Sequence, residues 1–129
     1  MSWDVFIQHL PSSAVHVADI PDDFEPLPLG TRADVMKTVA TVFASTDMTD
    51  PTWIKVSDQR YAIEIGVGDE DPVACVALHV RGDESVIPPI ARLVELFGAR
   101  AIDSWTGEFF ETERAAESIR QWRAFVDQL

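Results

Sequence analysis

Two stretches of alternating side chains, residues 61–67 and 73–80, constrain the fold of this chain more than any other feature. Apolar residues occupy every second position from Tyr61 to Val67, and residues 73–80 form the most apolar of the expected strands. A period of two is typical of β-strands with one buried face. The turn at 68–72 is short, so the two strands should be antiparallel neighbours. We therefore predict an antiparallel sheet with residues 73–80 at its centre.

The remaining elements follow from alternation, helical spacing and the positions of Pro and Gly. Pro11 ends a first strand, and residues 11–30 are irregular because four prolines interrupt them. Thr31 is a plausible N-cap for the first helix, and Gly98 is well placed to end the second. The expected strands cover residues 3–10, 53–57, 61–67, 73–80 and 99–103, and the expected helices cover about 31–44, 86–97 and 111–129.

This order of elements, β-α-β-β-β-α-β-α, predicts the fold class. Consecutive strands with short connections pair antiparallel, and the amphipathic helices must bury their apolar stripes against the sheet. We expect an α+β two-layer sandwich, with a mainly antiparallel sheet of about five strands and helices on one face. A length of 129 residues fits one domain, 1–129.

The charge balance limits the classes of partner. The chain has 22 Asp and Glu against 10 Lys and Arg, a formal net charge of -12 at pH 7. Phosphate backbones and anionic lipid headgroups attract basic surfaces and repel acidic ones. We therefore expect no nucleic acid and no membrane among its partners, and a basic protein is the partner that this charge favours.

Cysteine usage and the N-terminus bear on localisation. Cys75 is the only cysteine, so no internal disulfide can form, which fits a reducing compartment. The N-terminus carries no basic region followed by a long apolar run, and no apolar stretch approaches the ~20 residues of a membrane span. We expect a cytoplasmic protein, or one exported without an N-terminal signal.

One face of the predicted sheet could carry chemistry. If the helices cover the apolar face, Glu64, His79 and Arg81 project from the opposite, open face, where Asp4 and Lys55 could join them. A carboxylate, an imidazole and a guanidinium on neighbouring strands can form an acid/base group or an anion clamp. They can equally be solvated cross-strand ion pairs on a wet sheet face.

Acidic and aromatic segments are candidates for partner binding. The acidic residues lie in the irregular segment and in the turn after residue 67, where they would attract a basic partner. The aromatic residues follow the last expected strand, where they either anchor a partner or plug one end of the core. The candidates are Asp19, Asp22, Asp23, Glu25, Asp69, Glu70, Asp71, Trp105, Phe109 and Phe110.

Motifs for catalysis and for cofactors or metals give no further candidates. His9, His16, His79 and Cys75 lack the spacing of a zinc site. The acidic turn at 69–71 does not match a calcium-binding EF-hand loop. The chain has no Gly-x-Ser-x-Gly elbow and no glycine-rich phosphate loop. We predict no catalytic residue, no cofactor and no metal.

Several short motifs support a resemblance to a bacterial family. Residues 2–8 (SWDVFIQ), 20–24 (IPDDF) and 28–30 (PLG), with Glu64, residues 68–69 and residues 79–82 (HVRG), resemble a set of short acidic bacterial proteins of unknown function. The resemblance implies a bacterial, single-domain protein and assigns no catalytic residue. In size and acidity the chain is also similar to immunity proteins, which neutralise toxins that are often basic; this second likeness is one of class only.

Three functional hypotheses follow. The first is a non-enzymatic acidic binding protein that docks or neutralises a basic protein. The second is a small enzyme or ligand-binding domain that uses the open face around Glu64, His79 and Arg81. The third is self-association, as a homodimer, through the open face or the strand edges. We rank binding first, regard self-association as compatible with it, and rank the enzyme last.

Overall fold

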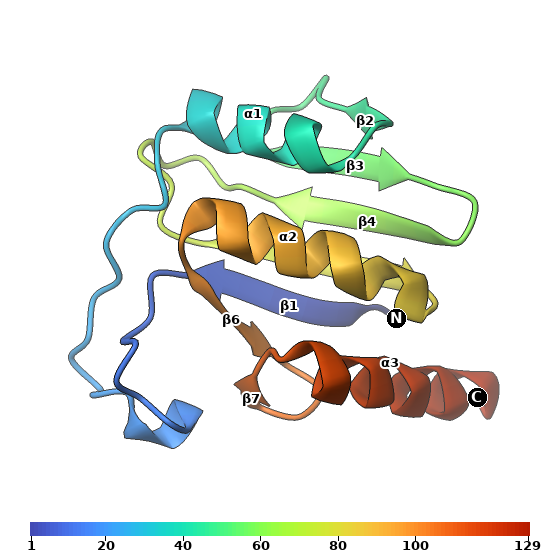
Figure 1. The fold of residues 1–129 in the computed structure, drawn as a ribbon. Helices are drawn as coiled ribbons and strands as arrows, with labels where there is room; N and C mark the ends of the chain where they lie inside the picture. Colours follow the sequence, from blue (N-terminus) through green and yellow to red (C-terminus); the bar gives the residue numbers. More distant parts are fainter.

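The computed structural model describes residues 1–129 and contains one antiparallel sheet with three helices on one face (Figure 1). The strands lie in the order β2-β3-β4-β5-β1-β6-β7, which confirms the α+β class. The strands are β1 (Trp3–Gln8), β2 (Thr46–Asp47), β3 (Trp53–Ser57), β4 (Tyr61–Gly66), β5 (Val76–Gly82), β6 (Arg100–Asp103) and β7 (Glu108–Phe109). The helices are α1 (Arg32–Val42), α2 (Ile87–Phe97) and α3 (Thr112–Asp127).

The sheet has seven strands where about five were expected. The two additional strands, β2 and β7, have two residues each and lie at the two edges of the sheet. Two residues cannot show an alternating pattern, which is why the sequence did not reveal them. The most apolar strand, β5, is the fourth of seven, as predicted, although it begins at Val76 and extends to Gly82.

The apolar sides of the strands face the helices and form the core. Ile63 and Ile65 of β4 and Leu78 of β5 are each 1% exposed or less. Complete burial of such a side chain contributes roughly 1.5–3 kcal/mol. Helix α3 is also tied to the sheet by a buried hydrogen bond, in which Trp3 Nε1 donates to Ser118 Oγ at 3.0 Å.

Local signals set the ends of two helices. Thr31 Oγ1 accepts a hydrogen bond from the Asp34 backbone N at 3.1 Å, so Thr31 is the N-cap of α1. Helix α2 ends at Gly98, whose φ of 60° lies in the left-handed region that favours glycine. Pro88 and Pro89 lie in the first turn of α2, where backbone N–H groups have no acceptor within the helix, so their absence in proline breaks no helical hydrogen bond.

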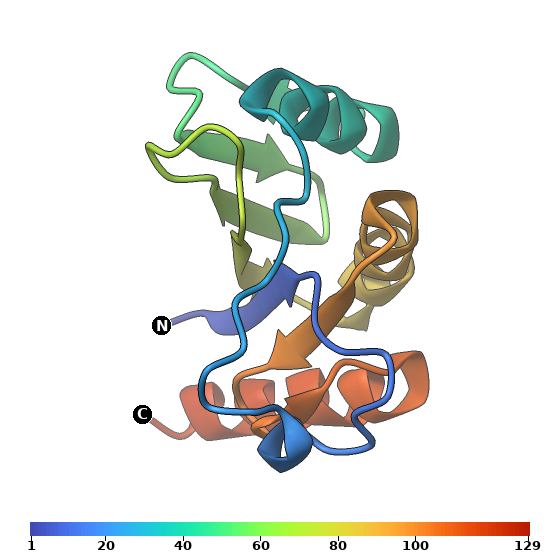
Figure 2. The same ribbon diagram turned by 90° about the vertical axis from the view of Figure 1, so that its left-hand side faces the viewer.

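The β1–α1 connection, residues 9–31, runs across one end of the molecule (Figure 2). It is irregular apart from one 3-10 turn at Val17–Asp19 and one bridging residue, Gly30. Near α1 the connection pairs with the residues that precede β5. There the Leu29 N donates to Val73 O at 2.7 Å, and the Val73 N donates to Gly30 O at 2.8 Å.

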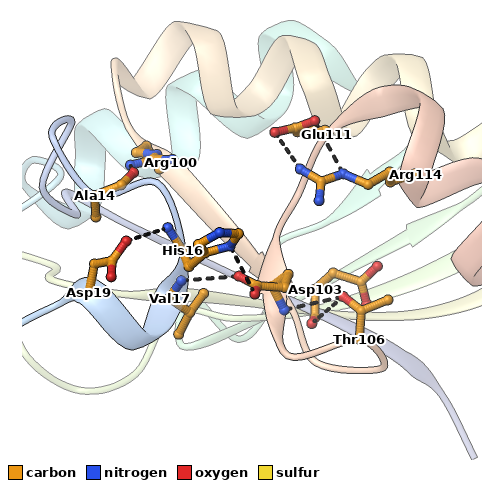
Figure 3. Close-up of polar contacts among 10 residues, drawn as sticks. Ala14, His16, Val17, Asp19, Arg100, Asp103, Thr106, Glu111 and Arg114 are labelled. Atoms are coloured by element: carbon orange, nitrogen blue, oxygen red, sulfur yellow. Dashed lines mark hydrogen bonds and ion pairs between the residues drawn. The ribbon is translucent and has the colours of Figure 1, made fainter.

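Strands β6 and β7 hold the other part of this connection (Figure 3). The Arg100 guanidinium donates to the backbone oxygens of Pro11 and Ala14, at 2.7 and 2.8 Å, and lies over the Phe109 ring at 3.5 Å. A Glu108 carboxylate oxygen accepts from the Val17 backbone N at 3.0 Å. The connection is therefore attached at two places: to Val73 before β5, and to Arg100 and Glu108 of β6 and β7.

Candidate functional site

A row of polar side chains crosses the open face of the sheet, opposite the helices. Each member is the register partner of the next, so the row runs straight across five adjacent strands. Side chains directly opposite one another in antiparallel strands have Cβ atoms about 4.5–5.5 Å apart. We call this set the polar row; in strand order from β2 to β1 it comprises Asp47, Lys55, Glu64, His79 and Asp4.

His79 is held in place from the β1 side. Its Nδ1 lies 2.9 Å from Asp4 Oδ1, and both side chains are about one-quarter to one-third exposed. The same Asp4 oxygen accepts from Ser2 Oγ at 2.6 Å, while Ser104 Oγ donates to the Asp4 backbone oxygen at 3.0 Å. A carboxylate bonded to one ring nitrogen fixes the orientation of an imidazole. Asp4 therefore positions the His79 ring.

Trp53 contacts His79 from the β3 side, a contact that the sequence reasoning did not anticipate. The two rings are stacked, with centroids 5.4 Å apart and an interplanar angle of 23°. Trp53 lies next to Gly66, its register partner on β4, where the absence of a side chain leaves room for the indole. Trp53 lies two residues before Lys55 on the same strand, so alternation alone could have placed it on this face.

The remaining predicted pair, Glu64 and Arg81, interacts only loosely. Arg81 Nη1 lies 3.8 Å from Glu64 Oε2, and the two side chains are 54% and 38% exposed. Exposed ion pairs of this kind contribute about 0–1 kcal/mol. All five predicted open-face residues therefore do lie on one face, but the closest contacts join His79 to Asp4 and Trp53 rather than to Glu64 or Arg81.

A depression of about 280 Å³ lies beside Trp53 and Lys55 at the β2 edge. It is lined also by Asp47 and Asp50, each held by a nearby threonine. Hydrogen bonds from Thr49, by its hydroxyl and its backbone N, lower the pKa of Asp47, and Thr52 lowers the pKa of Asp50 in the same way. Both carboxylates are therefore held in the ionised form.

A larger depression, of about 360 Å³, lies at the start of β3 and the end of β4. Its lining includes Trp53, Gly66, Val67, Asp69 and Cys75, and Asp69 contributes its only ionisable group besides the thiol. Burial raises the pKa of the Cys75 thiol, which disfavours the nucleophilic thiolate. The thiol therefore lines the wall of this depression as a small apolar group.

Both acidic segments predicted to bind a partner lie at the end of the molecule that the β1–α1 connection crosses, but at different positions along it (Figure 2). Pairing of residues 29–30 with Val73 brings the β1–α1 connection beside the turn that contains residues 69–71 (Figure 2). Arg32 joins them, because its backbone N donates to Asp71 Oδ1 at 3.0 Å and its side chain to Gly68 O at 3.0 Å. Residues 22–25 lie farther along the connection, near its 3-10 turn (Figure 2). We call the exposed carboxylates of the two segments together the acidic end: Asp22, Asp23, Glu25, Asp69, Glu70 and Asp71.

Asp19, the remaining acidic candidate, serves the local fold. Its Oδ2 accepts from the His16 backbone N at 2.9 Å and so caps the 3-10 turn (Figure 3). The neighbouring His16 ring nitrogen Nδ1 lies 3.4 Å from Glu108 Oε2. Asp19 is thus engaged within the β1–α1 connection, whereas the six residues of the acidic end form no ion pair.

The three aromatic candidates lie in different environments. Phe109 is 5% exposed and is covered by Arg100, and Phe110 packs against the core. Trp105 is 40% exposed and packs against Phe125 of α3, with ring centroids 5.6 Å apart. Only Trp105 therefore offers a substantial part of its ring to solvent.

No three His, Cys, Asp or Glu side chains are grouped so that they could hold a metal ion. None of the helices combines the length and apolarity required to cross a bilayer. Comparison with known proteins adds no relative: no family model, no curated protein and no solved structure matches this chain.

Proposed function

We propose that this chain is a non-enzymatic binding protein that docks a basic protein partner through its acidic end. The observation that carries the proposal is that two acidic segments, separated by more than 40 residues in the sequence, both lie at the end of the molecule that the β1–α1 connection crosses (Figure 2). Their carboxylates are exposed and form no ion pair, and only Asp71 accepts a hydrogen bond, from the Arg32 backbone N, so their field extends into solvent. Such a field raises the rate of encounter with a cationic surface.

Neutralisation of a basic toxin is the most specific form of this proposal. A net charge of -12 on 129 residues favours rapid association with a strongly basic protein. An inhibitor of this type needs no catalytic group, because tight docking over the partner's active surface suffices. The likeness in size and acidity to immunity proteins supports this form by analogy only.

The test begins with the tagged protein as bait in its native lysate at low and high salt. The recovered partner is then purified, and its association rate is measured as a function of ionic strength. Asp22→Lys/Asp23→Lys reverses two charges of the acidic end. Glu95→Lys/Asp127→Lys changes the net charge equally, at exposed positions near the C-terminal ends of α2 and α3 where cations suit the helix dipole.

We expect a basic partner whose association rate at low salt falls at least about tenfold in the Asp22→Lys/Asp23→Lys variant, with a weaker dependence on salt. The Glu95→Lys/Asp127→Lys control should lose much less. Equal rates for the two variants would show that the acidic end does not direct binding, and a partner that is not basic would refute the proposal.

The open face supports a second candidate, a small-ligand or enzymatic site centred on His79. The specific observation is the 2.9 Å contact between His79 Nδ1 and Asp4, an arrangement that can orient an imidazole as a general base. A fragment screen read out on the His79 ring resonances tests it, with Asp4→Asn as the variant. A fragment that binds wild type and loses affinity in Asp4→Asn supports the site, and a screen without any such fragment argues against it.

A further inference from the structure

Trp53 separates His79 from the larger depression on the open face. The indole is stacked on the imidazole, and it lies over the strand pair at Gly66 and Ala77. Cys75 immediately precedes β5 and His79 lies within it, so the two residues flank Ala77 along the chain. Because Cys75 lines the depression, the depression and the imidazole lie on opposite sides of the indole. One face of the Trp53 ring is thus covered by His79, and the other borders the depression.

The lining of this depression has the chemistry that recognises a long cationic side chain. Val67 and Cys75 provide an apolar surface, Trp53 an aromatic wall, and Asp69 a carboxylate at the rim. No Lys or Arg is among the lining residues, whereas Lys55 lines the smaller depression at the β2 edge. The nearest cation that the contacts show is Arg32, whose guanidinium donates to the oxygen of the lining residue Gly68 at 3.0 Å without itself lining the depression. Its volume of about 360 Å³ accommodates one extended side chain.

We infer that this depression receives an arginine side chain of the basic partner, with the guanidinium between the free face of Trp53 and the Asp69 carboxylate. The inference rests on the proposed function and names the chemical group that the partner contributes. Arginine fits better than lysine because its planar guanidinium stacks on an aromatic face and presents paired donors to a carboxylate. The methylene stem packs on Val67 and Cys75.

The position of the depression supports this occupant. Asp69 belongs both to the acidic end and to the lining of the depression. A basic partner that is steered toward the acidic turn at residues 69–71 therefore arrives beside Trp53, and the charge at the rim complements the cation. The indole is already held against His79, so little side-chain freedom is lost when the guanidinium stacks on it.

The probe is a blocked tetra-arginine peptide, compared with a tetra-lysine peptide of equal charge. Binding to the full chain is followed at low salt by NMR, using the Trp53 indole N–H and the Asp69 amide. Trp53→Leu and Asp69→Asn remove the two proposed contacts. The matched controls are Trp105→Leu, at the other exposed tryptophan, and Glu70→Gln, which removes the same charge one residue away from the lining.

We expect tetra-arginine to shift the Trp53 and Asp69 signals and to bind more tightly than tetra-lysine. Trp53→Leu removes the stacked contact with a partly desolvated cation, so its Kd should rise roughly fivefold or more. Asp69→Asn should have a similar effect, and each control should change Kd less than twofold. Because Asp69 is exposed in a turn, its variant keeps the test valid even if Trp53→Leu perturbs the fold.

Equal affinity for the two peptides, or equal losses in the variants and their controls, would overturn the inference. The same variants distinguish its failure from failure of the proposed function. If Trp53→Leu binds the native partner as wild type does while Asp22→Lys/Asp23→Lys binds it more slowly, only the arginine site is wrong. If neither variant affects the native partner, docking through the acidic end is wrong as well.

Discussion

Gly66 provides the space in which the Trp53 indole lies, and a larger side chain there should displace the ring from His79. A Cβ at position 66 would lie 3.2 Å from Trp53 Cζ3 and 3.7 Å from the Ala77 Cβ, where ordinary contacts span 3.4–4 Å. Gly66→Ala therefore requires the ring to move by a few tenths of an ångström, which it can do because Trp53 is 36% exposed. Gly66→Val adds methyl groups about 1.5 Å further out, so the indole cannot remain.

The energies follow from this geometry. Replacing glycine by alanine removes freedom from the unfolded chain and stabilises by about 0.4–1 kcal/mol, which the shift of the ring partly offsets. Loss of the stacked contact with His79 costs about 0.5–1.5 kcal/mol. We expect the free energy of unfolding of Gly66→Ala to lie close to that of wild type. That of Gly66→Val should be lower than that of Gly66→Ala by about 1 kcal/mol.

The assay combines urea unfolding with NMR of the His79 ring, whose C–H resonances are shifted by the stacked indole. In Gly66→Val these resonances should move toward those of a free imidazole, and in Gly66→Ala they should change little. Ala62→Val is the matched control, because Ala62 lies on the same strand and face but is exposed. Unchanged His79 resonances in Gly66→Val would refute the reasoning that the glycine seats the indole.

Three further predictions concern the elements that hold the site in place. Ser118→Ala leaves the buried Trp3 indole N–H without its acceptor and should lower the free energy of unfolding by about 1–3 kcal/mol in urea titrations; a change below about 0.3 kcal/mol would mean that the bond is not formed. Arg100→Met leaves two backbone carbonyls without their donor, so amide hydrogen exchange in residues 12–20 should accelerate while that of β5 does not; uniform acceleration would instead indicate general destabilisation. The folded-state pKa values of Asp47 and Asp50 lie below the unfolded values, so these groups stabilise the fold above about pH 4 and lose that contribution as the pH falls through their folded pKa values. Thr49→Val/Thr52→Val should therefore lower the free energy of unfolding at pH 6 more than at pH 2, and an equal loss at both values would contradict this linkage.

Most of the fold could be predicted because its central strands follow a strict period of two. Where that pattern is absent, prediction failed in a consistent way: β2 and β7 are two-residue strands that exist because a neighbouring strand offers free backbone groups. Pairing of that kind depends on the tertiary structure rather than on the local sequence. The prediction that β5 begins at residue 73 rather than at Val76 failed for the same reason, because Val73 pairs with Gly30 instead of with a neighbouring strand.

The sequence allowed us to predict which face of the sheet carries the candidate site, but not which of its side chains are in contact. Alternation placed Glu64, His79 and Arg81 on one side of the sheet, whichever strands lay beside them. The 2.9 Å contact of His79 with Asp4 requires β1 to lie next to β5, although the two residues are 75 positions apart. The contact of Arg32 with Asp71 likewise depends on a long-range bridge between Gly30 and Val73. Local patterns carry no information about such pairings.

The arrangement of charge on the open face bears on the choice between self-association and a different partner. The polar row reads acid, base, acid, imidazole, acid from Asp47 to Asp4, so it is nearly the same in both directions. A two-fold axis along the row would place each residue opposite its own copy. An axis along the strands through Glu64 would place Asp47 opposite Asp4, Lys55 opposite His79 and Glu64 opposite itself. Both alignments oppose like charges, which destabilises sheet contacts.

The edges of the sheet also provide little opportunity for a second copy of the chain to bind. Each edge strand has only two residues, so few free backbone groups are available for pairing with another sheet. A partner with its own charge pattern is not subject to either restriction, since it can present cations to carboxylates of the row such as Glu64 and Asp47. The charge order of the polar row and the short edge strands therefore disfavour self-association in these two alignments, which agrees with the proposed function.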